Sequence, residues 1–208
     1  MNNIYKCVKM CVMNQLRLFF AIDLPDKIKD QLLISARQEG GDYWRWTTQE
    51  NLHITMLFLG YANEQYLPQI IEAGEEACLD IEPFSLTISE LTLGPLGQNI
   101  SKRMIWANIK KEGRLEILKN DLADNLAKRQ INFQEENKLF RPHITVARLK
   151  SDSTSHPQDN GWKINFQKEF EAKELLLMAS DLGRSGPIYT PLQSYPFGLK
   201  TDKKDVII

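Results

Sequence analysis

The sequence has few cysteines, no excess of positive charge and no long hydrophobic run. Its three cysteines, Cys7, Cys11 and Cys78, do not make an even disulfide framework and are typical of a reducing compartment, so we expect a cytoplasmic protein. The formal net charge is -1, whereas proteins that coat long nucleic acids have a strong basic excess. Any contact with nucleic acid should therefore be local. The apolar stretch at residues 8–13 is interrupted by Lys9 and is too short to span a membrane.

Several catalytic and cofactor motifs are also missing from the sequence. It contains no G-x-S-x-G nucleophile elbow, no P-loop and no Rossmann glycine pattern. Cys7 and Cys11 are spaced like half of a metal site, but no second Cys or His pair has ligand spacing. We therefore expect no resident metal and no cofactor.

Short apolar and alternating segments predict strands, and helical spacing of apolar residues predicts three helices. The expected strands are 17–22, 52–59 (ended by Gly60), 84–93, 103–109, 143–149, 162–170, 174–180 and 189–197. The expected helices are one from Pro25 to the Gly40–Gly41 pair, one at about 64–79, and one at about 113–129 with Leu115, Leu118, Leu122 and Leu126 on one stripe. Together they predict one domain over residues 16–199. Residues 1–15 are expected to be a flexible leader, with alternative starts at Met10 and Met13, and residues 200–208 a tail.

The order strand, helix, histidine-bearing strand occurs twice in the chain. RLFFAI at 17–22 is followed by HITM at 53–56, and RMIWANI at 103–109 is followed by HITV at 143–146. This repeat predicts an α+β fold of two lobes related by a pseudo-twofold axis. Two antiparallel sheets would face a central groove, with the helices packed outside.

The two histidine motifs are the strongest functional signal. Side chains alternate along a strand, so His53 and Thr55 share one face, and His143 and Thr145 do the same. One neutral and one protonated imidazole suit phosphodiester chemistry, because a pKa near 6.5 allows either form at neutral pH. The hydroxyl groups can donate hydrogen bonds to phosphate oxygens, and Arg148 can balance their charge.

A structural interpretation of each residue competes with this one. Both threonines also favour strand formation, and a lone arginine such as Arg148 is usually a solvated charge. A single histidine in a strand is usually a half-buried polar residue. Two copies in equivalent positions of a repeat favour catalysis, since the chain has only three histidines. His156, between Ser and Pro in the polar segment 151–161, is expected to have no catalytic role.

Four segments resemble the 2H phosphoesterase superfamily, and more narrowly the RNA 2',3'-cyclic phosphodiesterases that are also called 2'-5' RNA ligases. They are RLFFAIDLP at 17–25, ENLHITMLFLG at 50–60, RPHITVARL at 141–149 and LMASDLGRSGPIYTPL at 177–192. The resemblance implies a bilobal fold and metal-independent opening of an RNA terminal 2',3'-cyclic phosphate to a 2'-phosphate.

The resemblance also implies a role for each motif residue. His53 would protonate the leaving 3' oxygen, and His143 would be the base that activates water. Thr55 and Thr145 would hold the phosphate, and Arg148 matches the family's basic position after the second motif. The partner would be an RNA 3' end or a small cyclic-phosphate nucleotide, with no membrane and no obligate protein partner.

Two alternatives stay open at this point. The same residues would serve a 2'-5' RNA ligase or a phosphodiesterase acting on a small cyclic-phosphate nucleotide. A non-catalytic module that binds RNA ends is the alternative of a different class, although the intact His and Thr pairs weigh against it.

Overall fold

The computed structural model describes residues 14–97, 101–133, 140–150, 161–183 and 186–198 of the chain. Its strands are β1 (Gln15–Asp23), β2 (Trp44–Trp46), β3 (His53–Asn63), β4 (Phe84–Gly94), β5 (Met104–Ile109), β6 (His143–Leu149), β7 (Lys163–Ala172), β8 (Glu174–Gly183) and β9 (Gly186–Pro196). Its helices are α1 (Asp26–Glu39), α2 (Leu67–Cys78) and α3 (Gly113–Lys128), with 3-10 turns η1 (Gln49–Asn51) and η2 (Glu64–Tyr66). The mixture of antiparallel strands and few helices confirms the α+β class.

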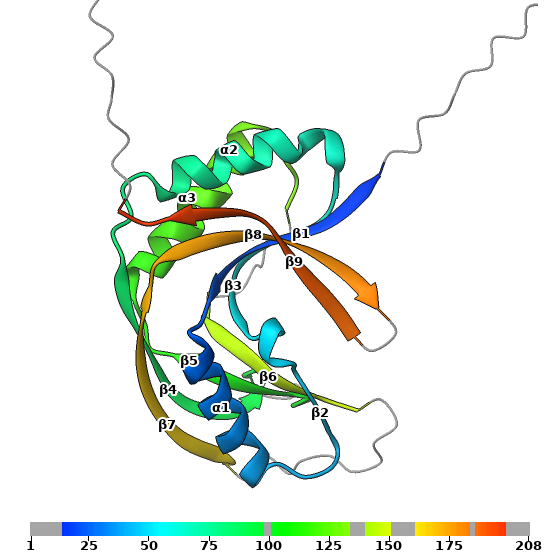
Figure 1. The fold of residues 1–208 in the computed structure, drawn as a ribbon, viewed down its shortest axis with the longest axis vertical. Coiled ribbons are helices and arrows are strands. Elements are labelled where there is room, and N and C mark those ends of the chain that lie inside the picture. The colour runs from blue at the N-terminus through cyan, green and yellow to red at the C-terminus, as the bar shows by residue number, and fades with distance from the viewer. Residues whose placement is uncertain (1–13, 98–100, 134–139, 151–160, 184–185, 199–208) are drawn as a thin grey trace, which may run out of the picture.

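The strands form one sheet of nine strands, in the order β7-β4-β5-β6-β3-β1-β8-β9, with β2 paired to β6 (Figure 1). The sequence predicted two separate sheets, whereas the structure has one continuous sheet whose two halves are joined at the centre. There the histidine-bearing strands β3 and β6 come close enough to pair, at the single position Ile54–Ile144. Both isoleucines are fully buried, so the joint between the two halves is apolar.

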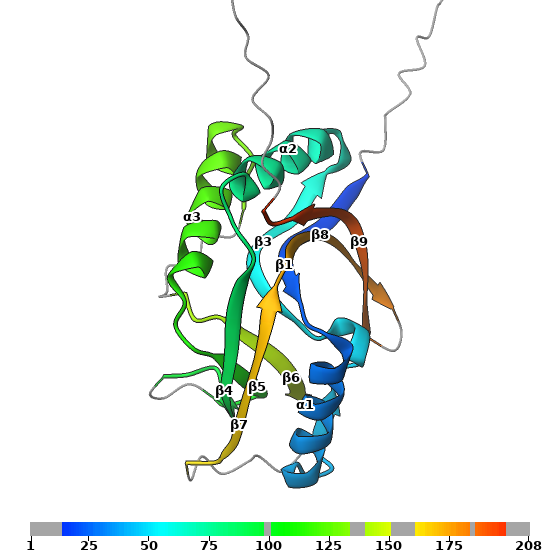
Figure 2. The same ribbon diagram turned by 60° about the vertical axis from the view of Figure 1, so that its left-hand side comes forward.

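The predicted leucine stripe of α3 is confirmed as core. Leu115, Leu118, Leu122 and Leu126 are all 0% exposed. Burial of each is worth roughly 1.5–3 kcal/mol. Helix α3 packs beside α2 at one end of the molecule and also contacts β3, while α1 lies at the other end against β6 and β7 (Figures 1 and 2). The helices therefore leave the groove side of β3 and β6 to the polar side chains.

Some boundaries differ from the sequence predictions. Gly60 does not end β3, which continues to Asn63. Gly60 is paired with Leu18 at a shift in the strand register and has a positive φ of 74°. A glycine absorbs such a bulge without steric strain. β1 begins at Gln15, one residue before the predicted domain start. Most of the predicted leader, the polar segment 151–160 and the tail lie outside the described residues.

Among the described residues, no helix combines the length and apolar character needed to cross a membrane.

Candidate active site

The two histidine motifs begin β3 and β6 and have the same pattern of burial along seven residues. The isoleucine of each motif is 0% exposed. The histidine and threonine of each motif are half-buried, as the alternation along a strand predicts: His53, Thr55, His143 and Thr145. The polar pair of each motif therefore faces away from the core.

The pairing of Ile54 with Ile144 brings the two motifs together. In an antiparallel pair, this register sets the residue before one isoleucine opposite the residue after the other. His53 is thus set opposite Thr145, and His143 opposite Thr55. Both motifs line one groove of about 1250 Å³, and Arg148 lines it as well. All the site residues expected from the sequence are therefore in this groove.

Each nitrogen of the His53 ring has a neighbour. Nδ1 lies 2.8 Å from the backbone oxygen of Asn51, which only accepts, so Nδ1 is the protonated nitrogen and donates. Nε2 lies 3.0 Å from the hydroxyl of Thr55, which donates to it when the imidazole is neutral. Proton transfer to or from a substrate would therefore take place at Nε2.

The surroundings of His53 favour the neutral ring. It packs against Phe19 and Tyr189, with ring centroids 5.0 Å and 5.2 Å away, and these two rings also contact each other. Burial is the main cause that lowers the pKa of His53 from 6.5 to about 4, and His143 and Lys29 lower it further. The hydrogen bond to the Asn51 carbonyl and the charge of Asp23 oppose this shift. In the free protein at neutral pH, His53 is therefore uncharged.

The ring of His143 is held by the same type of backbone hydrogen bond as that of His53, but it has different neighbours. Its Nδ1 donates to the backbone oxygen of Arg141 at 2.8 Å, the carbonyl two residues earlier, as in the first motif. Its ring stacks on the indole of Trp106, with centroids 3.8 Å apart. Trp106 is also the strand partner of Thr145. His53 thus contacts the rings of Phe19 and Tyr189, whereas His143 stacks on the indole of Trp106.

The groove has a local positive charge that the whole chain lacks. Among the described residues, the cationic ones that line the groove are Arg45, Lys119, Arg141 and Arg148, against one carboxylate, Glu50. The net charge of the chain is -1. An anionic ligand would therefore be attracted to the groove even though the net charge of the whole chain is not positive.

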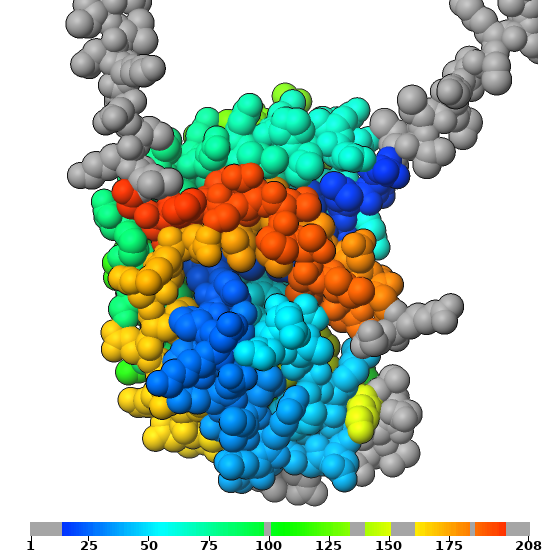
Figure 3. Space-filling model, viewed as in Figure 1, coloured from blue at the N-terminus to red at the C-terminus, as the bar shows by residue number. Residues whose placement is uncertain are grey.

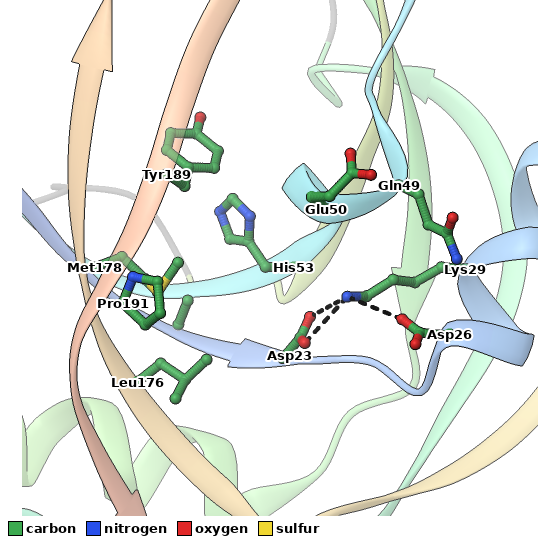
Figure 4. A pocket seen from close by; sticks show the side chains of 11 residues that line it. Asp23, Asp26, Lys29, Gln49, Glu50, His53, Leu176, Met178, Tyr189 and Pro191 are labelled. Carbon is green, nitrogen blue, oxygen red and sulfur yellow. Dashed lines mark hydrogen bonds and ion pairs between the residues drawn. The ribbon is translucent and has the colours of Figure 1, made fainter.

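A second pocket of about 440 Å³ is also lined by His53 (Figure 4). The ammonium of Lys29 points into it and contacts the Asp23 carboxylate at 2.8 Å and Asp26 at 3.8 Å. Asp23 is the strand partner of His53. This ion pair therefore lies next to the first motif.

Sequence reasoning did not identify several groove residues. Arg45 belongs to β2, a strand of three residues that was not predicted. Asn51 fixes the ring of His53 through its carbonyl, and its side chain donates to the Pro187 oxygen of β9 at 2.8 Å. Tyr189 comes from the same strand. The quoted segment GPIYTPL contains Pro187 and Tyr189, but no local pattern indicates that they cover His53.

No group of three or more His, Cys, Asp or Glu side chains that could hold a metal ion occurs within the described ranges. The comparisons with known proteins agree on a family. The model of the 2'-5' RNA ligase superfamily matches residues 24–184. The chain belongs to this superfamily.

Relatives of this superfamily member match it over nearly their whole length. A Methanocaldococcus jannaschii protein named RNA 2',3'-cyclic phosphodiesterase is 31% identical over 184 residues, which cover 86% of this chain and 100% of the relative. One of the same name from Archaeoglobus fulgidus is 32% identical, covering 86% and 99%. The crystal structure of E. coli LigT complexed with 3'-AMP has a TM-score of 0.71 and 26% identity, covering 89% of this chain and all of LigT. The superfamily fold thus extends over the described domain.

Proposed function

We propose that this protein is a metal-independent RNA 2',3'-cyclic phosphodiesterase that opens a terminal 2',3'-cyclic phosphate to a 2'-phosphate with two histidines. The main observation is the pair of motifs in one cationic groove, with each Nδ1 hydrogen-bonded to the carbonyl two residues earlier. This arrangement presents two imidazoles as Nε2 acid and base on either side of a phosphate. The relatives named RNA 2',3'-cyclic phosphodiesterase support the same reaction.

In the proposed reaction, His143 takes a proton from water as the water oxygen attacks phosphorus. The bond from phosphorus to the 3' oxygen breaks, and His53 gives its Nε2 proton to that oxygen. The hydroxyl groups of Thr55 and Thr145 donate to the nonbridging oxygens, and Arg148 balances their charge. Each positioned acid or base contributes roughly 10²–10⁴-fold. No metal or cofactor is needed for these steps.

The acid role requires His53 to be charged, although its pKa is about 4 in the free protein. A bound phosphodiester supplies a negative charge next to Nε2, and an opposite charge at this distance raises the pKa of an imidazole. We infer that substrate and proton are bound together at His53. The neutral ring in the free protein then avoids an uncompensated charge against Phe19 and Tyr189.

The test is incubation with an RNA oligonucleotide that ends in a 2',3'-cyclic phosphate, in the presence of EDTA, with identification of the product. We expect a 2'-phosphate with undiminished rate under chelation. His53→Ala and His143→Ala should each lower turnover, whereas His156→Ala, which alters the third histidine, is the matched control. Loss of turnover in EDTA with recovery on adding one metal ion would overturn the mechanism.

A second candidate is 2'-5' RNA ligation, which the name of the superfamily favours. The incoming 5' hydroxyl would replace water as the group deprotonated by His143, and the leaving 3' oxygen would be the same. Adding an RNA with a 5' hydroxyl to the assay, and following formation of a joined product, separates the two reactions. Binding of the cyclic-phosphate end without turnover would instead indicate a non-catalytic binding module.

We also propose that the domain of residues 16–199 consists of two lobes related by a pseudo-twofold axis. The strand order supports it, since β3, β1, β8 and β9 run outward on one side as β6, β5, β4 and β7 do on the other. Superposition of β1 and β3 on β5 and β6 should place His53 on His143. Action in the cytoplasm is proposed on the cysteine content alone.

A further inference from the structure

The groove face of β6 presents three successive rows of side chains. His143 is paired with Asn108 in the first row, and Thr145 with Trp106 in the second. In the third row Arg148 lies between Met104 of β5 and Arg45 of β2. From His143 to Arg148 the strand extends roughly 17 Å. The third row therefore lies beyond the Thr145 row, at the far end of this face from His143.

The third row sets two like charges side by side. Directly paired residues of adjacent strands project to the same face, and like charges at such a pair destabilise a sheet. Arg45 and Arg148 both line the groove, and Arg148 has the thioether of Met104 as a neighbour, 3.0 Å from Nη1. An anion held between the two guanidinium groups would turn this repulsion into two charge-assisted contacts.

We propose that Arg45 and Arg148 form a subsite for the phosphodiester that precedes the terminal nucleotide of an RNA strand. This inference rests on the proposed function and narrows its substrate class, because a mononucleotide has no such phosphate. The groove volume of about 1250 Å³ is larger than the 300–1,000 Å³ typical of small-ligand sites, as a strand of two or more nucleotides requires. Arg148 serves the terminal phosphate charge as well, so Arg45 is the residue specific to the longer substrate.

The half-buried Met104 and the exposed Leu96 give the same subsite an apolar side. Both line the groove, and Leu96 is 38% exposed. A thioether is polarisable and adapts to flat aromatic surfaces, so it suits contact with a base of any sequence. The subsite would thus recognise the strand and not its sequence.

The experiment compares 2',3'-cyclic AMP with the dinucleotide ApA that ends in a 2',3'-cyclic phosphate, in wild type, Arg45→Ala and Arg45→Lys. Arg45→Ala should lower kcat/KM for the dinucleotide roughly 10- to 100-fold, the loss expected for one charge-assisted hydrogen bond. It should lower kcat/KM for 2',3'-cyclic AMP much less than for the dinucleotide, because no upstream phosphate is present. Arg45→Lys should recover part of the loss. Lys168→Ala, on the outer strand β7, removes the same charge outside the groove and should affect neither substrate.

Binding without turnover provides a separate readout. Calorimetry with 3'-AMP and with ApA 3'-phosphate should show tighter binding of the dinucleotide in wild type and a much smaller preference for it in Arg45→Ala. This result would stand even if neither cyclic substrate were hydrolysed, so failure of the subsite and failure of the proposed function are distinguishable. The subsite is overturned if Arg45→Ala weakens both ligands equally, or if it leaves the preference for the dinucleotide unchanged.

Discussion

The indole of Trp106 stacks on the imidazole of His143, with ring centroids 3.8 Å apart and planes inclined by 24°. An aromatic face stabilises a neighbouring cation, so in the proposed reaction the indole would support the imidazolium that forms when His143 takes a proton. Gly94 makes room for this arrangement, because a Cβ at that position would lie 2.4 Å from the Trp106 ring. The second motif thus depends on two residues outside it.

Replacement of Trp106 should affect catalysis through this stack. Trp106→Ala should lower kcat/KM roughly 2- to 30-fold, equivalent to the 0.5–2 kcal/mol of a cation–π contact. Trp106→Phe retains an aromatic face and should retain most of the activity. Steady-state kinetics at neutral pH measures both, and equal losses in the two variants would show that the aromatic face is not what His143 requires.

The proposed division of labour between the histidines predicts unequal chemical rescue. His53→Ala lacks the proton for the leaving oxygen, so a substrate with a much better leaving group, such as a nitrophenyl ester, should restore part of its rate. His143→Ala should gain little, because water is still not activated. Rates of both variants on the two substrate types test this. Equal rescue would mean that the roles are misassigned.

The lowered pKa of His53 predicts a pH-dependent contribution to stability. Between pH 6.5 and about 4 the unfolded chain binds a proton at His53 and the folded protein does not. The stability that the neutral His53 ring contributes to the fold is therefore fully present above pH 6.5 and is lost as the pH falls toward 4. It amounts to at most roughly 3 kcal/mol.

Urea unfolding at pH 7.5 and pH 4.5 measures this difference. Wild type should lose more stability between the two pH values than His53→Gln, which cannot bind the proton. His156→Gln, which alters the third histidine, is the matched control and should keep the larger loss of wild type. Identical losses in wild type and His53→Gln would contradict the burial of the ring.

The ion pair beside His53 predicts unequal costs for its two partners. The side chain of Lys29 is 6% exposed and that of Asp23 is 43% exposed. Asp23→Asn leaves the buried ammonium without its carboxylate partner at 2.8 Å, which should cost roughly 1–3 kcal/mol of unfolding free energy. Lys29→Met leaves a carboxylate that water can reach, and should cost about 1 kcal/mol or less. Chemical denaturation of both variants tests the order, and a larger cost for Lys29→Met would refute it.

Local sequence patterns predicted the features that depend only on residues close together in the chain. The leucine spacing of α3 and the alternation in HIT segments follow from helix and strand geometry, so the core stripe and the shared face of His53 and Thr55 were predictable. Strand β2 was missed because three residues, Trp44–Trp46, are too few to show a period. Its pairing with β6 places Arg45 in the groove and has no local signal.

The inequality of the two histidines also could not be predicted from the motifs. Both have the same sequence pattern, and both use the carbonyl two residues earlier. What distinguishes them is long-range packing: Tyr189 reaches His53 from β9, while Trp106 reaches His143 from β5. In Figure 3 the orange surface of the β8–β9 hairpin lies beside the cyan surface of the η1 segment, where Asn51 binds Pro187.

The joint at Ile54 and Ile144 also affects how the molecule can move. The two halves of the sheet share one residue pair, so a small rotation of one half against the other would turn about a line through that pair. His53 and His143 each directly precede one of these two isoleucines in the sequence. Points close to an axis of rotation are displaced least. The outer walls of the groove, at Ile188 and Leu96, would be displaced most. Rotation about this joint would therefore change the width of the groove while changing the spacing between the two imidazoles little.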